Sequence, residues 1–78
     1  MNGPVSLDVL PLHATGTLVS ADVPGSAGQR LRTLGLRPGV QVSVIQRLAG
    51  GGRLVHVAGS RLALGRDVLR GLLAEQVR

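Results

Sequence analysis

The fold of this chain is decided by residues 26–40, which read SAGQRLRTLGLRPGV. Ser26 and Gln29 have the spacing of a capping box, in which each side chain satisfies a free backbone N–H of the other residue. Apolar residues then recur every three or four positions, which is typical of a helix with one buried face. These residues are Ala27, Leu31 and Leu34. The stretch therefore predicts a short helix over about residues 26–34.

The same stretch predicts how the helix ends. Gly35 stands where a left-handed residue closes a helix, and Leu31 and Leu36 occupy the positions whose apolar contact completes a Schellman motif. Pro38 prevents the helix from continuing. Pro38-Gly39 also suits the centre of a type II turn, because Gly39 tolerates the positive φ of the second central position.

Short strands are predicted on both sides of this helix. Alternating or β-branched apolar residues, bounded by glycine and proline, indicate five of them. We expect them at residues 18–21, 40–46, 54–57, 61–64 and 72–77. In the later strands Val40, Val42 and Val44 are expected to share one side, and Val55, Val57, Leu62 and Leu64 are expected to point inward.

The connections are expected to be tight turns. Gly50-Gly51-Gly52 predicts a hairpin loop, and Gly59-Ser60 predicts a turn. Asp67 is expected to cap a single helical turn at residues 68–70. Residues 7–12 form an apolar lead-in, broken by Pro11, that is expected to pack as a turn or irregular strand over one end of the sheet.

The bulk composition fits one small cytoplasmic domain with an aliphatic core. The 78 residues allow a single domain, 1–78, with its core at about 10–77. Phe, Trp, Tyr and Cys are absent, so leucine and valine must fill the interior without disulfides. No apolar run approaches the roughly 20 residues that span a bilayer, and residues 1–9 do not resemble a signal peptide. Five short strands joined by tight turns predict a closed or nearly closed barrel, mainly β, with one helix after the first strand.

The net charge of +5 comes from nine arginines and no lysine, spread from Arg30 to Arg78. Arginine suits carboxylates and phosphates because its guanidinium group donates hydrogen bonds in a fixed fork. Three interpretations stay open: a solvated basic surface, a positive patch for an acidic protein or a membrane face, and nucleic-acid binding.

Two blocks of this sequence resemble the FeoA family. Residues 30–40, RLRTLGLRPGV, are similar to the family signature RL-x-x-LGL-x-PG, and residues 59–67, GSRLALGRD, are similar to its second block, G-x-x-LAL. The resemblance covers about residues 10–77. It implies an SH3-like barrel with a helix inserted after the first strand.

The resemblance also implies a function. A FeoA protein would be a non-enzymatic, cytosolic accessory of bacterial ferrous-iron uptake that binds and regulates FeoB, a membrane transporter with a GTPase domain. It would be peripheral to the membrane through that partner. The same fold also occurs at the end of iron-dependent repressors, so an interaction domain of that kind, or a nucleic-acid-binding barrel, is the alternative. The lack of aromatic side chains for base stacking speaks against nucleic acid.

No catalytic or metal site is predicted. The candidate ligands have no metal-binding spacing. They are His13, His56, Asp8, Asp22, Asp67 and Glu75. A solvated His56 and a weak transition-metal contact at His56 both stay open. No recognisable base stands near Ser20, Ser26, Ser43 or Ser60, and the triple glycine lacks the frame of a phosphate loop. We expect no cofactor.

Partner binding is therefore the remaining role, and we expect it around the end of the helix. The candidate residues are Arg30, Leu34, Leu36, Arg37, Pro38, Arg61 and Arg66. They would form a small apolar patch with a basic rim. The alternative is that the leucines are core and cap residues and that the arginines are merely solvated. The oligomeric state is not predicted.

Overall fold

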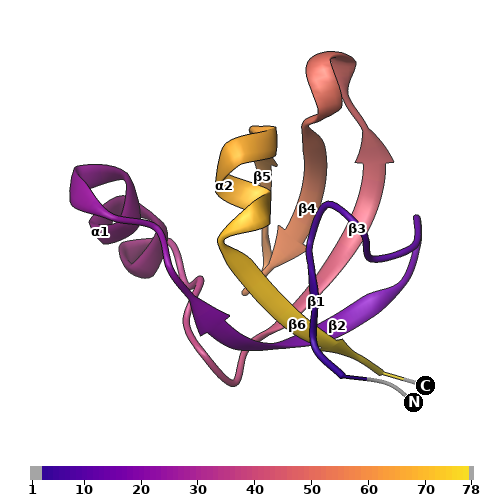
Figure 1. The fold of residues 1–78 in the computed structure, drawn as a ribbon, viewed down its shortest axis with the longest axis horizontal. Coiled ribbons are helices and arrows are strands. Elements are labelled where there is room, and N and C mark those ends of the chain that lie inside the picture. Colours follow the sequence, from indigo (N-terminus) through magenta and orange to yellow (C-terminus); the bar gives the residue numbers. More distant parts are fainter. Residues whose placement is uncertain (1–2, 78) are drawn as a thin grey trace.

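The computed structural model describes residues 3–77, which form six strands and two α-helices around one core (Figure 1). The elements, in chain order, are β1 (Val5–Ser6), β2 (Thr15–Ala21), α1 (Gly25–Thr33), β3 (Gln41–Arg47), the 3₁₀ turn η1 (Ala49–Gly51), β4 (Arg53–Val57), β5 (Ser60–Leu64), α2 (Arg66–Arg70) and β6 (Leu72–Gln76). The expectation of a mainly β domain with a short inserted helix is confirmed.

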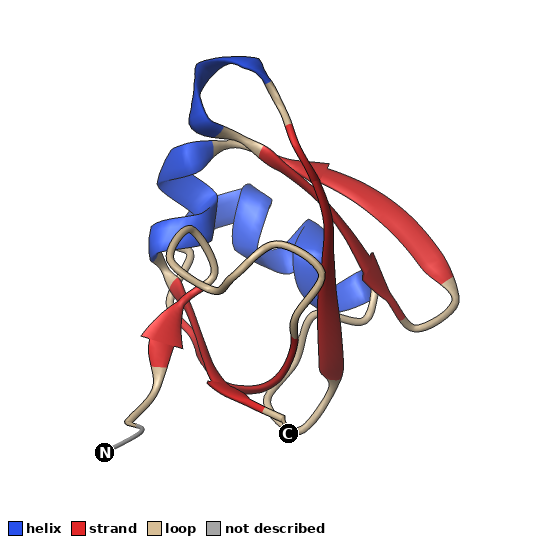
Figure 2. Cartoon of the chain, turned by 90° about the vertical axis from the view of Figure 1, so that its right-hand side faces the viewer, coloured by secondary structure: helices blue, strands red, loops and turns tan. Residues whose placement is uncertain are grey.

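All six strands belong to one antiparallel sheet with the order β1-β6-β2-β3-β4-β5. The sheet is strongly curved around the core (Figure 2). It is nevertheless open, with β1 and β5 at its edges, so the expected closure of the barrel is corrected. The sixth strand is β1, whose two residues pair with β6. Two residues are too few to produce a recognisable alternation in the sequence.

The core is entirely aliphatic, as the composition predicts. Among the described residues it is formed by Leu7, Leu10, Leu18, Leu31, Leu36, Val42, Val44, Val55, Val57, Leu64, Leu69, Leu72 and Ala74. The inward orientation predicted for the valines of β3 and β4 is confirmed, whereas Leu62 and Val40, which precedes β3, are only half-buried. No buried polar side chain in the described part of the chain lacks a hydrogen-bond partner.

The N-terminal segment after β1 closes one end of this core. Leu7 and Leu10 are fully buried, and the Leu7 N–H donates to the backbone oxygens of Leu69 and Leu72. The guanidinium group of Arg53 in β4 donates through Nη1 to the backbone oxygens of both Leu7 and Leu10. Hydrogen bonds from a charged donor are worth roughly 1.5–3 kcal/mol each. One arginine therefore fastens the lead-in to the sheet.

The end of α1 confirms the predicted Schellman motif. The N–H of Leu36 donates to the Leu31 oxygen at 2.9 Å, and the N–H of Gly35 donates to the Arg32 oxygen at 3.1 Å. Gly35 has a φ of +102°, and Leu31 and Leu36 are both buried in the core. The last free carbonyls of the helix are thus satisfied by the chain that leaves it.

The start of α1 differs from the prediction. The N-cap is Pro24, and no side chain caps the helix, so the Ser26–Gln29 capping box does not form. The helix begins one residue earlier than expected, which places Ser26 inside the first turn instead of before it. Asp67 likewise lies inside the first turn of α2, whose N-cap is Gly65, and it makes no capping bond.

Gly28 sets the position of α1 relative to the preceding chain. A Cβ atom at Gly28 would lie 1.8 Å from the backbone oxygen of Val23, a distance that no side chain can tolerate. The helix therefore packs its backbone directly on the Val23 peptide. The predicted turn after α1 is also present: the Val40 N–H donates to the Arg37 oxygen at 3.2 Å, and Gly39 has a φ of +96°.

The two hairpins of the β3-β4-β5 meander are tight. Gly50 and Gly51 both have positive φ in the loop between β3 and β4, which confirms the hairpin predicted there. Between β4 and β5 the central residues are Ala58 and Gly59, with φ values of +51° and +80°. This turn therefore lies one residue earlier than the predicted Gly59-Ser60 turn. Two positive φ angles in a two-residue loop identify a type I′ turn.

Candidate docking groove

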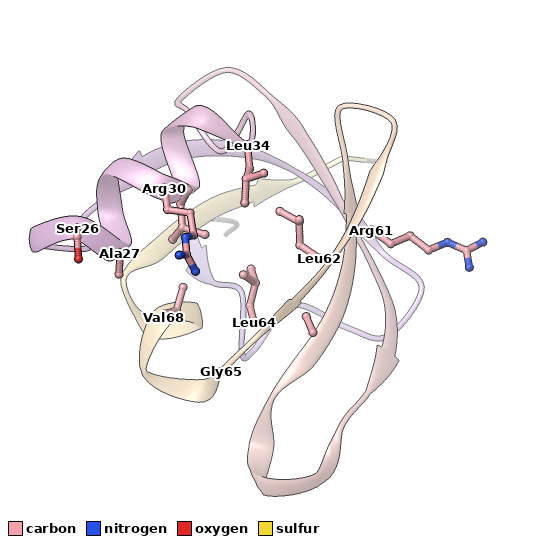
Figure 3. Close-up of a pocket in the computed structure, with 11 residues that line it drawn as sticks. Ser26, Ala27, Arg30, Leu34, Arg61, Leu62, Leu64, Gly65 and Val68 are labelled. Atoms are coloured by element: carbon pink, nitrogen blue, oxygen red, sulfur yellow. The ribbon is translucent and has the colours of Figure 1, made fainter.

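A groove with a volume of about 530 Å³ separates α1 from β5 and the start of α2 (Figure 3). It is lined by Ser26, Ala27, Arg30, Leu31, Leu34, Arg61, Leu62, Ala63, Leu64, Gly65 and Val68. Its size falls within the roughly 300–1,000 Å³ of typical ligand sites. The groove exists because α1 stands to one side of the strands instead of packing flat on them.

The wall on the α1 side is aliphatic with one cation. Leu31 anchors the helix with only 8% of its surface exposed, while Leu34, at the C-cap, is 41% exposed. Arg30 projects into the gap between α1 and β5 (Figure 3). The helix therefore offers an exposed leucine and a guanidinium group on the same wall.

The wall on the β5 side follows from the alternation of a strand. Leu62 and Leu64 point toward the groove, whereas Arg61 points to the opposite face of the sheet (Figure 3). Leu64 is buried and Leu62 is half-buried, so Leu62 is the more accessible of the two. Val68 extends this apolar wall from α2.

The electrostatic character of the groove is neutral to positive. None of the lining residues is acidic, and Arg30 brings a guanidinium group into the groove, whereas the Arg61 side chain points away from it. Among residues 3–77 the structure contains one ion pair, between Arg70 Nε and an oxygen of Asp8 at 3.9 Å, and it lies outside the groove. The groove thus suits a ligand that combines aliphatic groups with negative charge.

The residues predicted from the sequence to bind a partner do not all lie on one surface. Arg30, Leu34 and Arg61 all line the groove. Leu36 is fully buried, with an exposed fraction of 0%, because it closes the Schellman motif. Its nomination as a surface residue is therefore corrected, and it is a core residue.

The other three nominated residues are exposed but do not line the groove. Arg37 and Pro38 lie in the turn after α1. Arg66 lines a smaller hollow of about 230 Å³ near the β3-β4 loop, together with residues that include Arg47 and Arg53. The predicted patch is thus divided between several surfaces.

Sequence reasoning missed the other eight members of the groove, which are Ser26, Ala27, Leu31, Leu62, Ala63, Leu64, Gly65 and Val68. The alternation of β5 correctly placed the two leucines on the inner face of the sheet. It assigned them to the core, because a sequence pattern does not reveal that α1 stands away from that face.

Within residues 3–77 no group of three or more His, Asp or Glu side chains could hold a metal ion. His13 and His56 are both exposed; His13 lies in the turn before β2, and His56 lies in β4. The described helices include none that is long and apolar enough to cross a membrane.

Comparison with known proteins identifies relatives of this fold. The family model of the FeoA domain matches residues 5–76. No curated protein sequence matches the chain significantly. Among solved structures, a FeoA described as an iron uptake regulatory protein shares 24% identity, covers 96% of this chain and 100% of its own, and superposes with a TM-score of 0.84.

Two further structures come from named organisms. FeoA from Stenotrophomonas maltophilia, complexed with zinc and described as an SH3 domain protein, shares 28% identity, with coverage of 95% and 96% and a TM-score of 0.80. FeoA from Chlorobium tepidum, solved by NMR, shares 21% identity, with coverage of 95% of this chain and 71% of that chain and a TM-score of 0.87. The predicted SH3-like fold is thereby confirmed.

Proposed function

Because the chain belongs to the FeoA family, which is associated with ferrous iron transport, we propose that it is a non-enzymatic accessory of bacterial ferrous-iron uptake. It acts in the cytoplasm, where it binds the cytosolic part of a FeoB-type transporter and regulates it. The Stenotrophomonas maltophilia relative is described as a candidate activating factor of ferrous iron transport, which supports a regulatory role.

One observation carries the mode of action: the groove between α1 and β5 is lined mainly by aliphatic side chains, of which Leu34 is 41% exposed. Interfaces commonly combine a central apolar anchor with a polar or charged rim. Here Leu34 and Leu62 supply the anchor, and Arg30 supplies the charged rim, while the Arg61 side chain points to the opposite face of β5. We place the contact with the transporter in this groove.

A binding experiment tests this assignment. The tagged protein is used to capture the detergent-solubilised transporter of the same organism, with and without GTP. Leu34→Glu should reduce capture at least about tenfold, because it places a charge in the centre of an apolar contact. Val9→Glu is the matched control, since Val9 is an exposed aliphatic residue, 62% exposed, outside the groove.

Function in the cell is tested by deletion of the gene. Ferrous-iron uptake should fall, and it should be restored by the wild-type protein and the Val9→Glu variant but not by Leu34→Glu. Unchanged uptake in the deletion strain would contradict the proposed function. No specific observation in the structure favours nucleic-acid binding. A shift of duplex DNA or single-stranded RNA at near-physiological salt would be needed to support it.

A further inference from the structure

The edge strand β5 has a free row of backbone groups along the groove. It pairs with β4 on one side, and the described part of the sheet has no strand on its other side. The hairpin between them is a type I′ turn, so Val57 and Ser60, which flank the turn, exchange both backbone hydrogen bonds. Hydrogen-bonded and non-hydrogen-bonded pairs then alternate along the register.

This alternation determines which residues face outward. Val55↔Leu62 is again a hydrogen-bonded pair, whereas His56↔Arg61 and Leu54↔Ala63 are not. The N–H and C=O groups of Arg61 and Ala63 therefore point away from β4, toward the free edge. Both residues are exposed, and both line the groove.

Such an edge is a ready template for another strand, and proteins usually cover it or protect it with charge. The opposite edge of this sheet is β1, which has only two residues. β5 offers five residues, a length of about 17 Å, and α1 faces it across the groove without covering it. We propose that the groove binds an extended segment of a partner protein, which adds to the edge of β5 as a further strand.

The side chains of β5 define the chemistry of that segment. On one face of the added strand, alternate side chains would meet Leu62, Leu34 and the rest of the aliphatic wall. On the other face, they would lie beside Arg61, at the spacing of a cross-strand pair. The segment should therefore alternate aliphatic residues with residues that include at least one carboxylate.

Charge also distinguishes this occupant from a second copy of the chain. The chain has nine arginines against four acidic residues, and the groove itself contains no acid. Two copies would bring like charges together at the edge. A polyproline segment is equally unsuited, because grooves that bind such segments are lined by aromatic side chains and this chain has none.

The inference rests on the proposed function for the source of the partner segment. Overlapping peptides, each about 12 residues long and so longer than β5, are tiled over the cytosolic part of the FeoB-type transporter. Binding is measured by fluorescence anisotropy. A designed peptide of alternating valine and glutamate is the second probe, so that strand addition can be tested independently of the transporter.

The critical variant is Ala63→Pro. Proline at this position removes an N–H that points to the free edge, so the ladder to β4 keeps its hydrogen bonds. We expect the affinity for a bound peptide to fall about tenfold or more, which corresponds to the loss of one backbone hydrogen bond. The matched control is Ala63→Val, which keeps the N–H and should bind like the wild type.

A second readout uses the wild-type protein and does not depend on the variants. Peptide binding should slow the hydrogen exchange of the Arg61 and Ala63 amides, measured by NMR, because only strand addition protects both. In addition, Arg61→Glu should weaken binding of the acidic peptide and improve binding of a valine–lysine peptide. Arg47→Glu, an exposed arginine of β3 outside the groove, is the control and should change neither.

Three outcomes would overturn strand addition: no peptide binds, a bound peptide leaves both amides unprotected, or Ala63→Pro binds as well as Ala63→Val. If the whole transporter is still captured in these cases, the proposed function stands and only the mode of binding is wrong. If the valine–glutamate peptide binds and protects both amides while the transporter is not captured, strand addition stands and the proposed partner is wrong.

Discussion

The two edges of the sheet differ in how completely the rest of the chain covers them. At the β1 edge the chain folds back over the core, where Leu7 and Leu10 are fully buried and Arg53 holds their carbonyl groups. At the β5 edge, α1 approaches but leaves a groove in which Leu34 and Leu62 are only partly covered. A domain with so small a core gives up stabilising burial at one edge, and the docking role that we propose for this surface requires such exposure.

The largest expected difference between the edges comes from removing a leucine at each. Leu10→Ala should lower the free energy of unfolding by about 3 kcal/mol, because it empties a fully buried site. Leu34→Ala should lower it by less than about 1 kcal/mol, because the side chain already meets solvent. Urea denaturation measures both values. Equal losses would show that the groove is closed in solution.

A second comparison concerns how the groove wall is fixed. Gly28→Ala should cost about 2 kcal/mol, because the new Cβ would clash with the Val23 oxygen and force α1 to move. Gly65→Ala is the matched control at the groove, since its φ is −72° and a Cβ there would meet no atom within 4 Å. Thermal melting should separate them by several degrees. A stable Gly28→Ala variant would mean that α1 is free to shift.

Arg53, which holds the segment after β1 to the sheet, supplies the third test. Arg53→Ala should cost about 1–2 kcal/mol, less than two full charged hydrogen bonds, because the bonds to the Leu7 and Leu10 oxygens are only partly buried and water can replace part of them. Arg47 lies opposite Arg53 in the β3–β4 register but is exposed, so Arg47→Ala should stay within about 0.5 kcal/mol of the wild type. Equal changes in the free energy of unfolding for the two variants would show that Arg53 does not hold the N-terminal segment to the sheet.

The smallest effect is expected at the ion pair between Asp8 and Arg70. The two atoms lie 3.9 Å apart, and the Arg70 side chain is 56% exposed. Arg70→Gln should change stability by less than about 0.5 kcal/mol, because exposed pairs gain little over their hydration. Melting temperatures in low and high salt should be nearly the same for the wild type and the variant. A large salt effect confined to the wild type would contradict this.

Features that depend on neighbouring residues could be predicted from the sequence. The Schellman end of α1 and the Pro38-Gly39 turn both appear as expected, since a glycine in each is required by a positive φ. The start of α1 could not be predicted in the same way. Ser26 and Gln29 have capping-box spacing, but the helix begins at Gly25, so the pattern falls inside the first turn.

Features that depend on contacts between residues far apart in the sequence could largely not be predicted. The strand β1 exists only because Val5 pairs with Ala74, at the other end of the chain. The groove was predicted only in part. The sequence identified Arg30, Leu34 and Arg61 as candidate binding residues, but it assigned Leu62 to the core. Its exposure depends on the distance of α1 from β5, which is set by tertiary packing between segments far apart in the sequence. No local pattern encodes that distance.

The strand order has a consequence for folding during synthesis. The last strand, β6, lies between β1 and β2. Until it has been made, β1 lacks its only neighbouring strand and β2 lacks one of its two. The β3-β4-β5 meander can assemble as soon as it leaves the ribosome, whereas Leu7 must wait for its hydrogen-bond partners Leu69 and Leu72. Because β1 and β6 are adjacent, a circular permutant that joins the two ends of the chain would make the β1–β6 pairing local and remove this delay.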